Sequence, residues 1–543
     1  MPDNTPLPID PLNGARIVLQ GRAVTMDSRF KVLPRARVYI DRGNIVAVQD
    51  SAMPAPSGFD DIAVLDTKGT LYPGLIELHN HLAYNLLQLW KVPKKYSNRD
   101  QWAGTPEYRR LISGPMQIVG KTPELLPALT RYVEAKCLLS GVTTSQGIAL
   151  YSSAGVRKFY RGLIRNVEQT DEADLPEAST RIPDVDASDI VRFKERLLKQ
   201  SCFLLHLSEG TDTKARNAFL ALKMAGADWA ITRALAGIHC AALHEEDFRT
   251  MAQFEGAMVW SPLSNLLLYG ETARIKAAKS EGVRIGLGSD WSPSGSKNLL
   301  GELKAAKLWS DEHGVFSDRE LVAMATRNGA NIVGWGKRLG SLQSGKRADL
   351  IVVKGDDKDP YEQLIRATEG DVALVMINGV PRCGLPSWMK KLGVKASEGE
   401  SCKVDGSART LFLKQDTQDP AVASLALGPA TEMLTKALKQ LPKLARKLEE
   451  PRPVAALARR KPVWQLALDE LEEGGHLRPN LPFAHVYTGA RPQVGAGSKK
   501  LSEIVTPLVL DPLTVVDDAH FIDRIEAQAN LPDAVRTQLR ALY

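Results

Sequence analysis

Two separate parts of the chain alternate apolar and polar residues in short runs, as exposed β-strands do. The first part includes the runs 15–20 and 36–41, and the second includes the run 372–378. They lie on either side of a region with a different pattern, so the simplest arrangement joins them. We predict a small composite β-sandwich built from residues 13–72 and 336–395.

Between these parts, over residues 73–335, short apolar runs alternate with longer stretches of helical periodicity. This alternation is typical of repeated parallel β-α-β units. An eighth strand is not defined by the pattern, although the spacing leaves room for it within 168–200. The region therefore predicts the α/β class, as a (β/α)8 TIM-type barrel. Its predicted strands are 74–78, 142–146, 162–167, 202–207, 235–239, 257–261 and 284–289, and its predicted helices are 122–139, 189–199, 213–225, 245–254, 272–281 and 317–326.

The pattern changes again after residue 396. Residues 397–410 are polar and weakly patterned, which predicts a linker. Helical periodicity returns in 421–448, 522–528 and 534–542. Residues 396–543 are therefore predicted to form a mostly helical C-terminal extension, and no motif in it indicates chemistry.

Composition narrows the class of protein. A net charge of +7 over 543 residues is mild, and the basic residues near the C-terminus fit a solvated helix face better than a surface for an acidic partner. We predict no nucleic-acid partner. No apolar run reaches the ~20 residues of a membrane helix, and the polar N-terminus lacks the features of a secretory signal. The five cysteines are scattered without a CxxC pair. We predict a cytoplasmic protein with reduced thiols.

Candidate chemistry lies where the predicted strands end. His79 and His81 end the first strand, and side chains two apart on a strand point the same way. A lone His-x-His fits a metal pair, but it equally fits one structural histidine beside one without a role. His206, His239 and Asp290 fall at three further strand ends, where barrel enzymes place their sites. That convergence favours the metal site.

The residue types indicate the kind of metal site. Imidazoles and a carboxylate without thiolates favour a catalytic zinc, or a similar metal, over a closed structural site. Such an ion lowers the pKa of water and makes hydroxide available near neutral pH. Glu209 follows His206 by three residues and is the candidate general acid and base. The alternative for Glu209 is an acid stabilised at the N-terminus of a helix.

An ordered set of motifs resembles the amidohydrolase superfamily, and within it the cytosine, guanine and adenosylhomocysteine deaminases and the triazine hydrolases. The resemblance covers about residues 13–395. The matching segments are Pro73-Gly-Leu-Ile-Glu-Leu-His79-Asn-His81, His206-Leu-Ser-Glu209, Gly237-Ile-His239-Cys, Ser261-Pro-Leu-Ser-Asn265, Gly286-Leu-Gly-Ser-Asp290 and Gly340-Ser-Leu-Gln-Ser-Gly-Lys-Arg-Ala-Asp349-Leu.

The resemblance implies a role for each matching residue. Asp290 would accept a proton from the metal-activated water, and Glu209 would hand a proton to the departing nitrogen. His239 would polarise the substrate or stabilise the tetrahedral intermediate, and Asn265 would hold the loop over the site. The ligands of one divalent metal ion, zinc with Fe²⁺ as the alternative, would be His79, His81, His206 and Asp290.

Binuclear relatives carry a carboxylated lysine after the fourth strand, and no lysine occupies a suitable strand end here. One metal ion is therefore expected. Glu168 is the alternative, as a carboxylate that bridges to a second ion, although it follows the third predicted strand.

Two features depart from the deaminases. They usually carry a substrate-holding histidine between the third and fifth strands, whereas 168–200 contains none. The segment 90–102 after the first strand is rich in aromatic and cationic residues, which fits either a flat or anionic substrate or a packed lid. Trp291 is a wall of the pocket or part of the core.

The sequence therefore predicts a metal-dependent hydrolase that attacks a non-peptide C–N bond of a small molecule: a cyclic amide, an amidine or an aminated ring. The alternative is a catalytically inactive binding or scaffold protein that works through its C-terminal extension. Use of the same site by an isomerase or lyase also stays open, because a fold does not determine a reaction. Neither the substrate nor homo-oligomer formation can be derived from the sequence.

Overall fold

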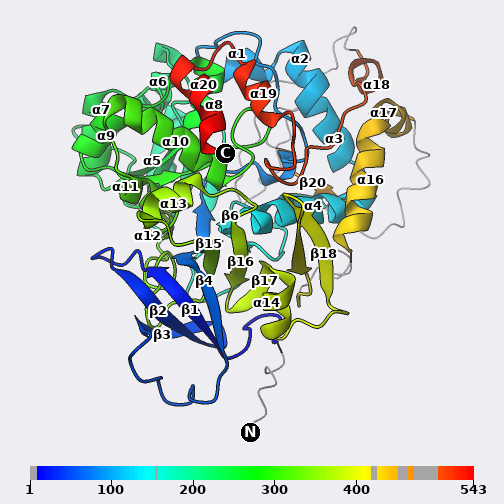
Figure 1. The fold of residues 1–543 in the computed structure, drawn as a ribbon. Helices are drawn as coiled ribbons and strands as arrows, with labels where there is room; N and C mark the ends of the chain where they lie inside the picture. Colours follow the sequence, from blue (N-terminus) through cyan, green and yellow to red (C-terminus); the bar gives the residue numbers. More distant parts are fainter. Residues whose placement is uncertain (1–8, 153–156, 417–424, 451–462, 469–498) are drawn as a thin grey trace.

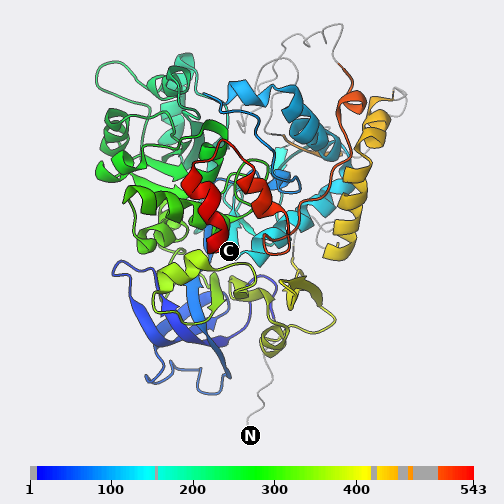
Figure 2. The same cartoon turned by 45° about the horizontal axis from the view of Figure 1, so that its top comes forward.

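The computed structural model describes residues 9–152, 157–416, 425–450, 463–468 and 499–543. The N-terminal strands and the strands that follow the central region lie together at one end of the molecule (Figure 1). The central α/β region, drawn mostly in green, lies at the other end, and the C-terminal helices in red pack against it (Figures 1 and 2). Among the described helices, none is long and apolar enough to cross a bilayer.

Strands from both flanks of the central region belong to one nine-stranded sheet. They meet where β4 and β15 pair antiparallel, with Leu71 opposite Val352. The sheet is therefore composite, while its closure into a sandwich stays a prediction. Its strands, in spatial order, are β18 (Gly399–Val404), β19 (Ser407–Phe412), β17 (Val380–Gly384), β16 (Val372–Ile377), β15 (Leu350–Lys354), β4 (Val64–Pro73), β1 (Ile17–Val24), β2 (Val32–Asp41) and β3 (Asn44–Asp50).

The predicted linker 397–410 is wrong, because these residues form the hairpin of β18 and β19. Its inward side chains are few but fully buried, including Val404 and Leu411. Arg409 is also buried and donates to the carbonyl oxygens of Val372 (3.1 Å) and Gly370 (2.7 Å). A buried arginine in an edge hairpin gives a polar sequence, which conceals the alternation.

The central region contains two parallel sheets whose edges meet. At one junction, the amide of Asp290 donates to the His79 carbonyl oxygen (2.9 Å) and the amide of His81 donates to that of Asp290 (2.7 Å). At the other, the amide of Ala178 donates to the Val167 carbonyl oxygen (2.8 Å). The sheets consist of β5 (Leu75–Glu77), β6 (Val142–Ser145) and β9 (Arg165–Asn166), and of β10 (Ser179–Arg181), β11 (Phe203–Leu207), β12 (Leu235–His239), β13 (Ala257–Trp260) and β14 (Arg284–Leu287).

The predicted helices of this region are present, with shorter bounds. They are α4 (Leu126–Leu139), α5 (Ile190–Leu197), α6 (Thr213–Leu220), α7 (Glu245–Gln253), α9 (Ile275–Ser280) and α11 (Asp318–Met324). Two further helices, α8 (Pro262–Tyr269) and α10 (Leu299–His313), were not predicted. All of α8 and most of α10 are buried around the helix, so neither shows the one-sided apolar stripe of an amphipathic helix.

Shorter elements complete the described chain. A small sheet joins β7 (Ala149–Ser152) to β8 (Arg157–Phe159) and to β20 (Trp464–Leu466) from the C-terminal part. The remaining α-helices are α1 (Asp100–Ala103), α2 (Pro106–Tyr108), α3 (Gly114–Gly120), α12 (Arg327–Ile332), α13 (Pro360–Arg366), α14 (Pro386–Lys391), α16 (Leu427–Lys439), α17 (Leu441–Glu449), α18 (Leu501–Ile504), α19 (Phe521–Glu526) and α20 (Asp533–Gln538).

The C-terminal part is bonded into the central region. Asp511 is fully buried and accepts hydrogen bonds from the Nζ atoms of Lys136 (2.6 Å) and Lys297 (2.8 Å). Gln528 makes two hydrogen bonds to the segment after β5. Its Nε2 donates to the Trp90 carbonyl oxygen (2.9 Å) and its Oε1 accepts from the Val92 amide (3.1 Å). The extension therefore supports the segment that covers the strand ends.

Candidate metal centre and active site

Four strand ends bring the five predicted residues to one place. His79 and His81 follow β5, His206 lies near the end of β11, His239 ends β12, and Asp290 follows β14. All except His81 are almost completely buried. His239 and Asp290 have left-handed backbone conformations (φ 67° and 66°), which are unfavourable for residues other than glycine. The chain therefore accepts local strain at two of these ends.

Four ligand-type atoms converge at these ends. The Nε2 atom of His206 lies 3.1 Å from that of His79 and 3.2 Å from that of His81. Asp290 Oδ1 lies 3.4 Å from the Nε2 atoms of both His79 and His81. Burial and the neighbouring imidazoles hold the pKa of His79 and of His206 well below 6.5, so these rings are neutral. The centre is electron-rich.

This cluster fits a divalent ion. Ligands at ~2.0–2.1 Å from one ion lie roughly 2.9–3.4 Å from one another, and the observed spacings of 3.1–3.4 Å match that range. Without a cation, neutral imidazole nitrogens and a carboxylate oxygen at these distances would present lone pairs to one another. Chemistry and spacing together identify a group able to bind a metal ion.

Serine hydroxyls orient two of these side chains. Ser261 Oγ lies 2.7 Å from His79 Nδ1, so this ring directs its other nitrogen, Nε2, to the centre. Ser264 Oγ donates to Asp290 Oδ2 at 2.6 Å, which leaves Oδ1 facing the histidines. Partners of this kind hold metal-ligating side chains in place. Both serines belong to the segment that opens α8.

A chain of hydrogen bonds assigns the proton of His239. Trp260 Nε1, which can only donate, bonds to Thr272 Oγ1 (2.7 Å), whose hydroxyl donates to Asn265 Oδ1 (3.3 Å). Asn265 Nδ2 then donates to His239 Nδ1 at 3.0 Å. Nδ1 is therefore an acceptor, and a neutral His239 carries its proton on Nε2, which faces Glu209 Oε2 at 3.7 Å. Asn265 contacts this ring directly.

Glu209 is held from two sides. Tyr269 donates from its hydroxyl to Glu209 Oε1 (2.8 Å) and accepts from Trp102 Nε1 (3.0 Å). Burial and the neighbouring Glu209 raise the pKa of Tyr269 well above 10, so the phenol stays protonated. On the other side, Arg99 Nη1 lies 3.6 Å from Glu209 Oε2 and donates to the Ile182 carbonyl oxygen (3.0 Å). Glu209 therefore faces the centre with one oxygen already bonded.

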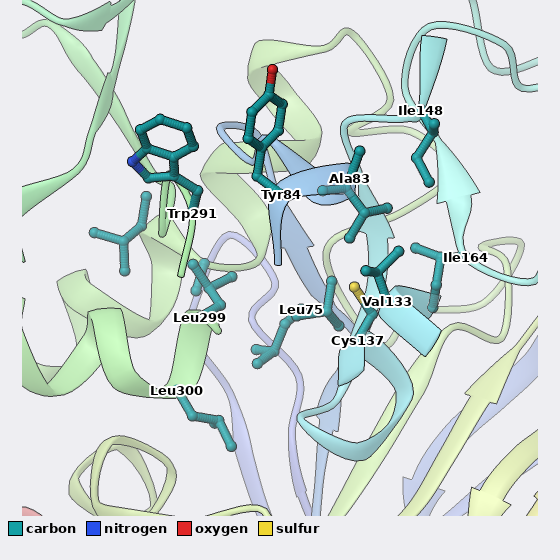
Figure 3. Close-up of a cluster of buried hydrophobic side chains, with 14 of the residues drawn as sticks. Leu75, Ala83, Tyr84, Val133, Cys137, Ile148, Ile164, Trp291, Leu299 and Leu300 are labelled. Carbon is teal, nitrogen blue, oxygen red and sulfur yellow. The ribbon is translucent and has the colours of Figure 1, made fainter. Parts of the chain in front are cut away.

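Aromatic side chains line the chamber above these groups. Trp291 is their common neighbour, with ring centroids 5.2 Å from Tyr84 and 6.2 Å from both Trp102 and Tyr108. Figure 3 shows Tyr84 and Trp291 rising side by side from different segments. We call the space bounded by these four rings, Arg99 and Glu209 the aromatic chamber. Its flat walls and few polar groups suit a planar ligand.

Comparisons with known proteins agree with this geometry. The amidohydrolase family model matches residues 204–382, which include His206, Glu209, His239 and Asp290. This part of the chain is therefore similar to the amidohydrolase family. His79 and His81 precede the matched region and complete the cluster from β5.

Related proteins and folds extend the match beyond this domain. A 5-methylthioadenosine/S-adenosylhomocysteine deaminase of Desulfitobacterium hafniense is 25% identical over 408 residues, covering 67% of this chain and 92% of its own. An adenosine deaminase from Xanthomonas campestris with bound zinc has a TM-score of 0.54 at 16% identity, covering 78% of this chain and 100% of its own. A zinc complex of atrazine chlorohydrolase from Arthrobacter aurescens has a TM-score of 0.52 at 20% identity, covering 67% of this chain and 94% of its own. These two structures support a mixed α/β fold of the TIM-barrel type.

The remaining residues that the sequence singled out differ in whether they line the site. In the segment 90–102, Trp90 and Tyr96 pack into the core, whereas Arg99 and Trp102 line the aromatic chamber. Trp291 is both buried and part of the chamber wall. Among the described residues, the metal-binding groups at this centre do not include Glu168, which accepts from the Gly147 amide (2.9 Å) and from Thr180 Oγ1 (2.6 Å).

Sequence reasoning missed several residues that contact the predicted ones. Tyr269 is the clearest case, because it lies one helical turn after Asn265 on α8, on the side that faces the site. That spacing was visible in the sequence, but α8 itself was not predicted. Arg99 lay inside a segment already singled out. Nothing in the sequence pattern indicated that Ser261 and Ser264 orient the ligand side chains.

Proposed function

We propose that the protein is a metal-dependent hydrolase that attacks a non-peptide C–N bond of a small molecule, and that the preferred substrate is an aminated planar ring. The convergence of His79, His81, His206 and Asp290 beneath the aromatic chamber is the observation that carries this proposal. Glu209 and His239 stand beside the cluster, where acid–base groups of a hydrolase are needed. Relatives named as deaminases support the same class of reaction.

The proposed ligands of one ion are His79, His81, His206 and Asp290, and the proposed ion is zinc, with Fe²⁺ as the alternative. When bound, such an ion lowers the pKa of water, so that hydroxide is available near neutral pH. The mixed imidazole and carboxylate set suits either metal.

The side chains of this protein supply the proton transfers. Asp290 Oδ1 faces the cluster while its other oxygen accepts from Ser264, which makes Oδ1 the acceptor of the proton that the attacking water loses. Glu209 Oε2 hands a proton to the departing nitrogen, because Oε1 is held by Tyr269. His239 donates from Nε2 to the substrate and stabilises the charge that develops on it.

The aromatic chamber favours a planar ring as the substrate. A planar heterocycle can stack on Trp102 and Trp291, whose faces are apolar and attract the edges of other aromatic groups. An aliphatic cyclic amide or a linear amidine would leave much of this surface without a partner. The aminated ring is therefore favoured among the three classes that the sequence allowed.

A substrate screen with a matched variant tests this function. Aminated purines including 5-methylthioadenosine, aminated pyrimidines, pterins, cyclic ureides and amidines are each assayed for released ammonia and for ring opening. Glu209→Gln should lower turnover of any active compound by about 10²–10⁴-fold, because it removes the transferable proton, while the metal content stays unchanged. Glu195→Gln, on the exposed face of α5, is the control and should retain full activity.

The outcome also separates the hydrolase from a scaffold. Activity that persists in Glu209→Gln would overturn the acid–base assignment. If the zinc-loaded protein turned over none of these compounds, the proposed reaction class would be wrong and the scaffold alternative would gain support.

A further inference from the structure

Ser113 differs from the other polar groups on the wall of the aromatic chamber. The two indole N–H groups of the chamber are bonded within the protein, because Trp291 Nε1 donates to Ser294 Oγ (2.5 Å) and Trp102 Nε1 donates to the Tyr269 hydroxyl (3.0 Å). Ser113 lines the same chamber and is only 8% exposed. Among the described residues, none is a hydrogen-bond partner of its hydroxyl group.

A buried hydroxyl without a partner is unfavourable, because folding has removed its hydrogen bonds to water. Most buried polar groups of native proteins are bonded, so an exception calls for an explanation. A serine hydroxyl can both donate and accept a hydrogen bond. A ligand that enters the aromatic chamber can supply the partner that the protein itself does not offer to Ser113.

An irregular helical turn precedes α3. The segment η2 (Arg109–Ser113) is π-helical and joins α2 to α3, and the Gly114 amide donates to the Arg109 carbonyl oxygen, five residues earlier. Pro115 explains this widening, because a proline has no amide hydrogen and its ring crowds the carbonyl group four residues before it. Single π-helical turns are rare and occur frequently at functional sites.

The widened turn decides which side chains face the chamber. Residues five apart in an α-helix point roughly 140° away from one another, whereas in a π-helical turn they approach the same side. Tyr108 and Ser113 are five apart, and both line the aromatic chamber. The ring of Tyr108 packs against Trp102, with centroids 5.2 Å apart. Ser113 therefore belongs to the same wall as the indoles.

The C-terminal part fixes this turn. A Cβ added to Gly114 would lie 2.9 Å from Val505 Cγ1 and 2.5 Å from the Arg109 carbonyl oxygen, so a side chain at this position would clash. The following helix, α3, also contacts α17 (Figure 1). The position of Ser113 thus depends on close packing between η2 and the extension.

The charges around the chamber indicate which partner suits Ser113. Arg99 faces Glu209 Oε2 at 3.6 Å and Asp184 Oδ2 at 3.8 Å, so its charge is compensated. Asp100 and Glu209 line the chamber as well, which disfavours an anionic substituent. These carboxylates can accept from N–H groups of a ligand. The hydroxyl of Ser113 adds an uncharged donor, which suits an uncharged acceptor.

We propose that Ser113 is a specificity-determining residue whose hydroxyl donates to an uncharged acceptor, such as a ring carbonyl oxygen, on the planar substrate. This inference rests on the proposed function, because it narrows the aminated ring to one that also carries a carbonyl group. The ring then stacks beside Trp102 and Trp291, and its carbonyl edge meets η2. The extension contributes to specificity through the packing of Val505 against Gly114.

Binding of two probes that carry no amine tests this role without turnover. The zinc-loaded full-length protein is titrated with 1-methyl-2-pyridone, whose ring carbonyl accepts a hydrogen bond, and with toluene, which has no acceptor oxygen. Binding is followed by saturation-transfer NMR. Ser113→Ala should weaken the pyridone about three- to tenfold relative to toluene, the loss expected for one neutral hydrogen bond. Ser280→Ala, on the exposed face of α9, is the control and should leave this ratio unchanged.

Further variants locate the probes and guard against misfolding. Trp102→Leu should weaken both probes, and if it affected neither, the ring would not lie in the aromatic chamber and the proposal would fail. Ser113→Cys keeps the shape of the side chain but donates more weakly, so it should lower the ratio in the same direction. Thermal midpoint and metal content are measured for every variant. A ratio that stays the same in well-folded Ser113→Ala or Ser113→Cys would overturn the role of Ser113.

Turnover separates this inference from the proposed function. If no ring compound is hydrolysed but the probes behave as expected, the hydrolase proposal fails and the role of Ser113 stands. If aminated rings are hydrolysed, pairs that differ by one ring carbonyl, such as cytosine and 4-aminopyrimidine, are compared. Ser113→Ala should raise KM for the carbonyl-bearing member alone, with little change in kcat. Equal effects on both members would contradict the role of Ser113 while leaving the hydrolase in place.

Discussion

The floor and the wall of the candidate site are built from different kinds of structure. The floor, formed by His79, His81, His206, His239 and Asp290, consists of side chains at the ends of parallel strands. The wall of the aromatic chamber comes largely from the segment between β5 and α3, which carries Tyr84, Arg99, Trp102 and Tyr108.

The two regions also differ in what holds them. Strand pairing and short hydrogen bonds such as Ser264 to Asp290 (2.6 Å) fix the floor from within the central region. The wall segment depends on distant parts of the chain, because Gln528 bonds to Trp90 and Val92, and Asp511 accepts from Lys136, which also donates to the Asn85 carbonyl oxygen (2.6 Å). The floor should therefore govern metal binding and turnover, whereas the wall should govern substrate affinity and depend on the C-terminal extension.

The largest effect on stability is expected at Asp511. Burial lowers the pKa of Lys136 and Asp511 opposes this, so Asp511→Asn leaves Lys136 buried without its counter-charge and weakens the support of Lys297. Breaking a buried ion pair in this way costs about 3–5 kcal/mol. The thermal midpoint should fall by several degrees, measured by calorimetry. Asp523→Asn, at an exposed position of α19, is the control and should change the midpoint little. An unchanged midpoint in Asp511→Asn would contradict the supporting role of the extension.

A smaller, kinetic effect is expected at Trp102. Trp102→Leu removes one flat wall, and KM for the ring substrate should rise about 10–100-fold, since one stacked aromatic contributes about 1–3 kcal/mol. Trp102→Phe keeps a ring but loses the indole donor to Tyr269, and its KM should stay close to that of the wild type. Steady-state kinetics on both variants show whether Trp102 acts through its ring face or through its hydrogen bond. Equal loss in both would mean that Trp102 acts through its hydrogen bond and not through its face.

The smallest effect is expected at Tyr269, where wall and floor meet. Tyr269→Phe removes the donor to Glu209 Oε1, and kcat should fall about tenfold with KM and metal content unchanged. Because burial raises the pKa of Tyr269 well above 10, the phenol does not ionise between pH 6 and about 10. If the activity of the wild type changes with pH at alkaline values below 10, Tyr269→Phe should therefore show the same change. Loss of that change in the variant would show that Tyr269 itself titrates in that range.

The same contrast explains what the sequence could predict. The residues of the floor were found because strand ends in parallel units share one edge, and histidines and an aspartate recur there. The strand left open within 168–200 is β10, whose three residues are too short to show a period. α10 was missed because most of its residues are buried, and the hairpin of β18 and β19 because Arg409 makes a buried position look polar.

The wall could not be predicted from pattern because its contacts join residues far apart in the sequence. Trp102 meets Tyr269, and Lys136 meets Asp511, only after the segments between them have folded. No local period encodes such a meeting. Leu466 is a similar case, since its place in a cavity that His81 and His206 also line follows from pairing between β20 and β7.

Metal stoichiometry tests the central claim most directly. The wild type and the double variant His79→Ala/His206→Ala are purified side by side and analysed for bound metal by mass spectrometry. We predict close to one divalent ion per chain in the wild type, and loss of that ion in the double variant with little change in the fold seen by circular dichroism. A wild type without stoichiometric metal, or a double variant that retains it, would contradict the assignment of this centre.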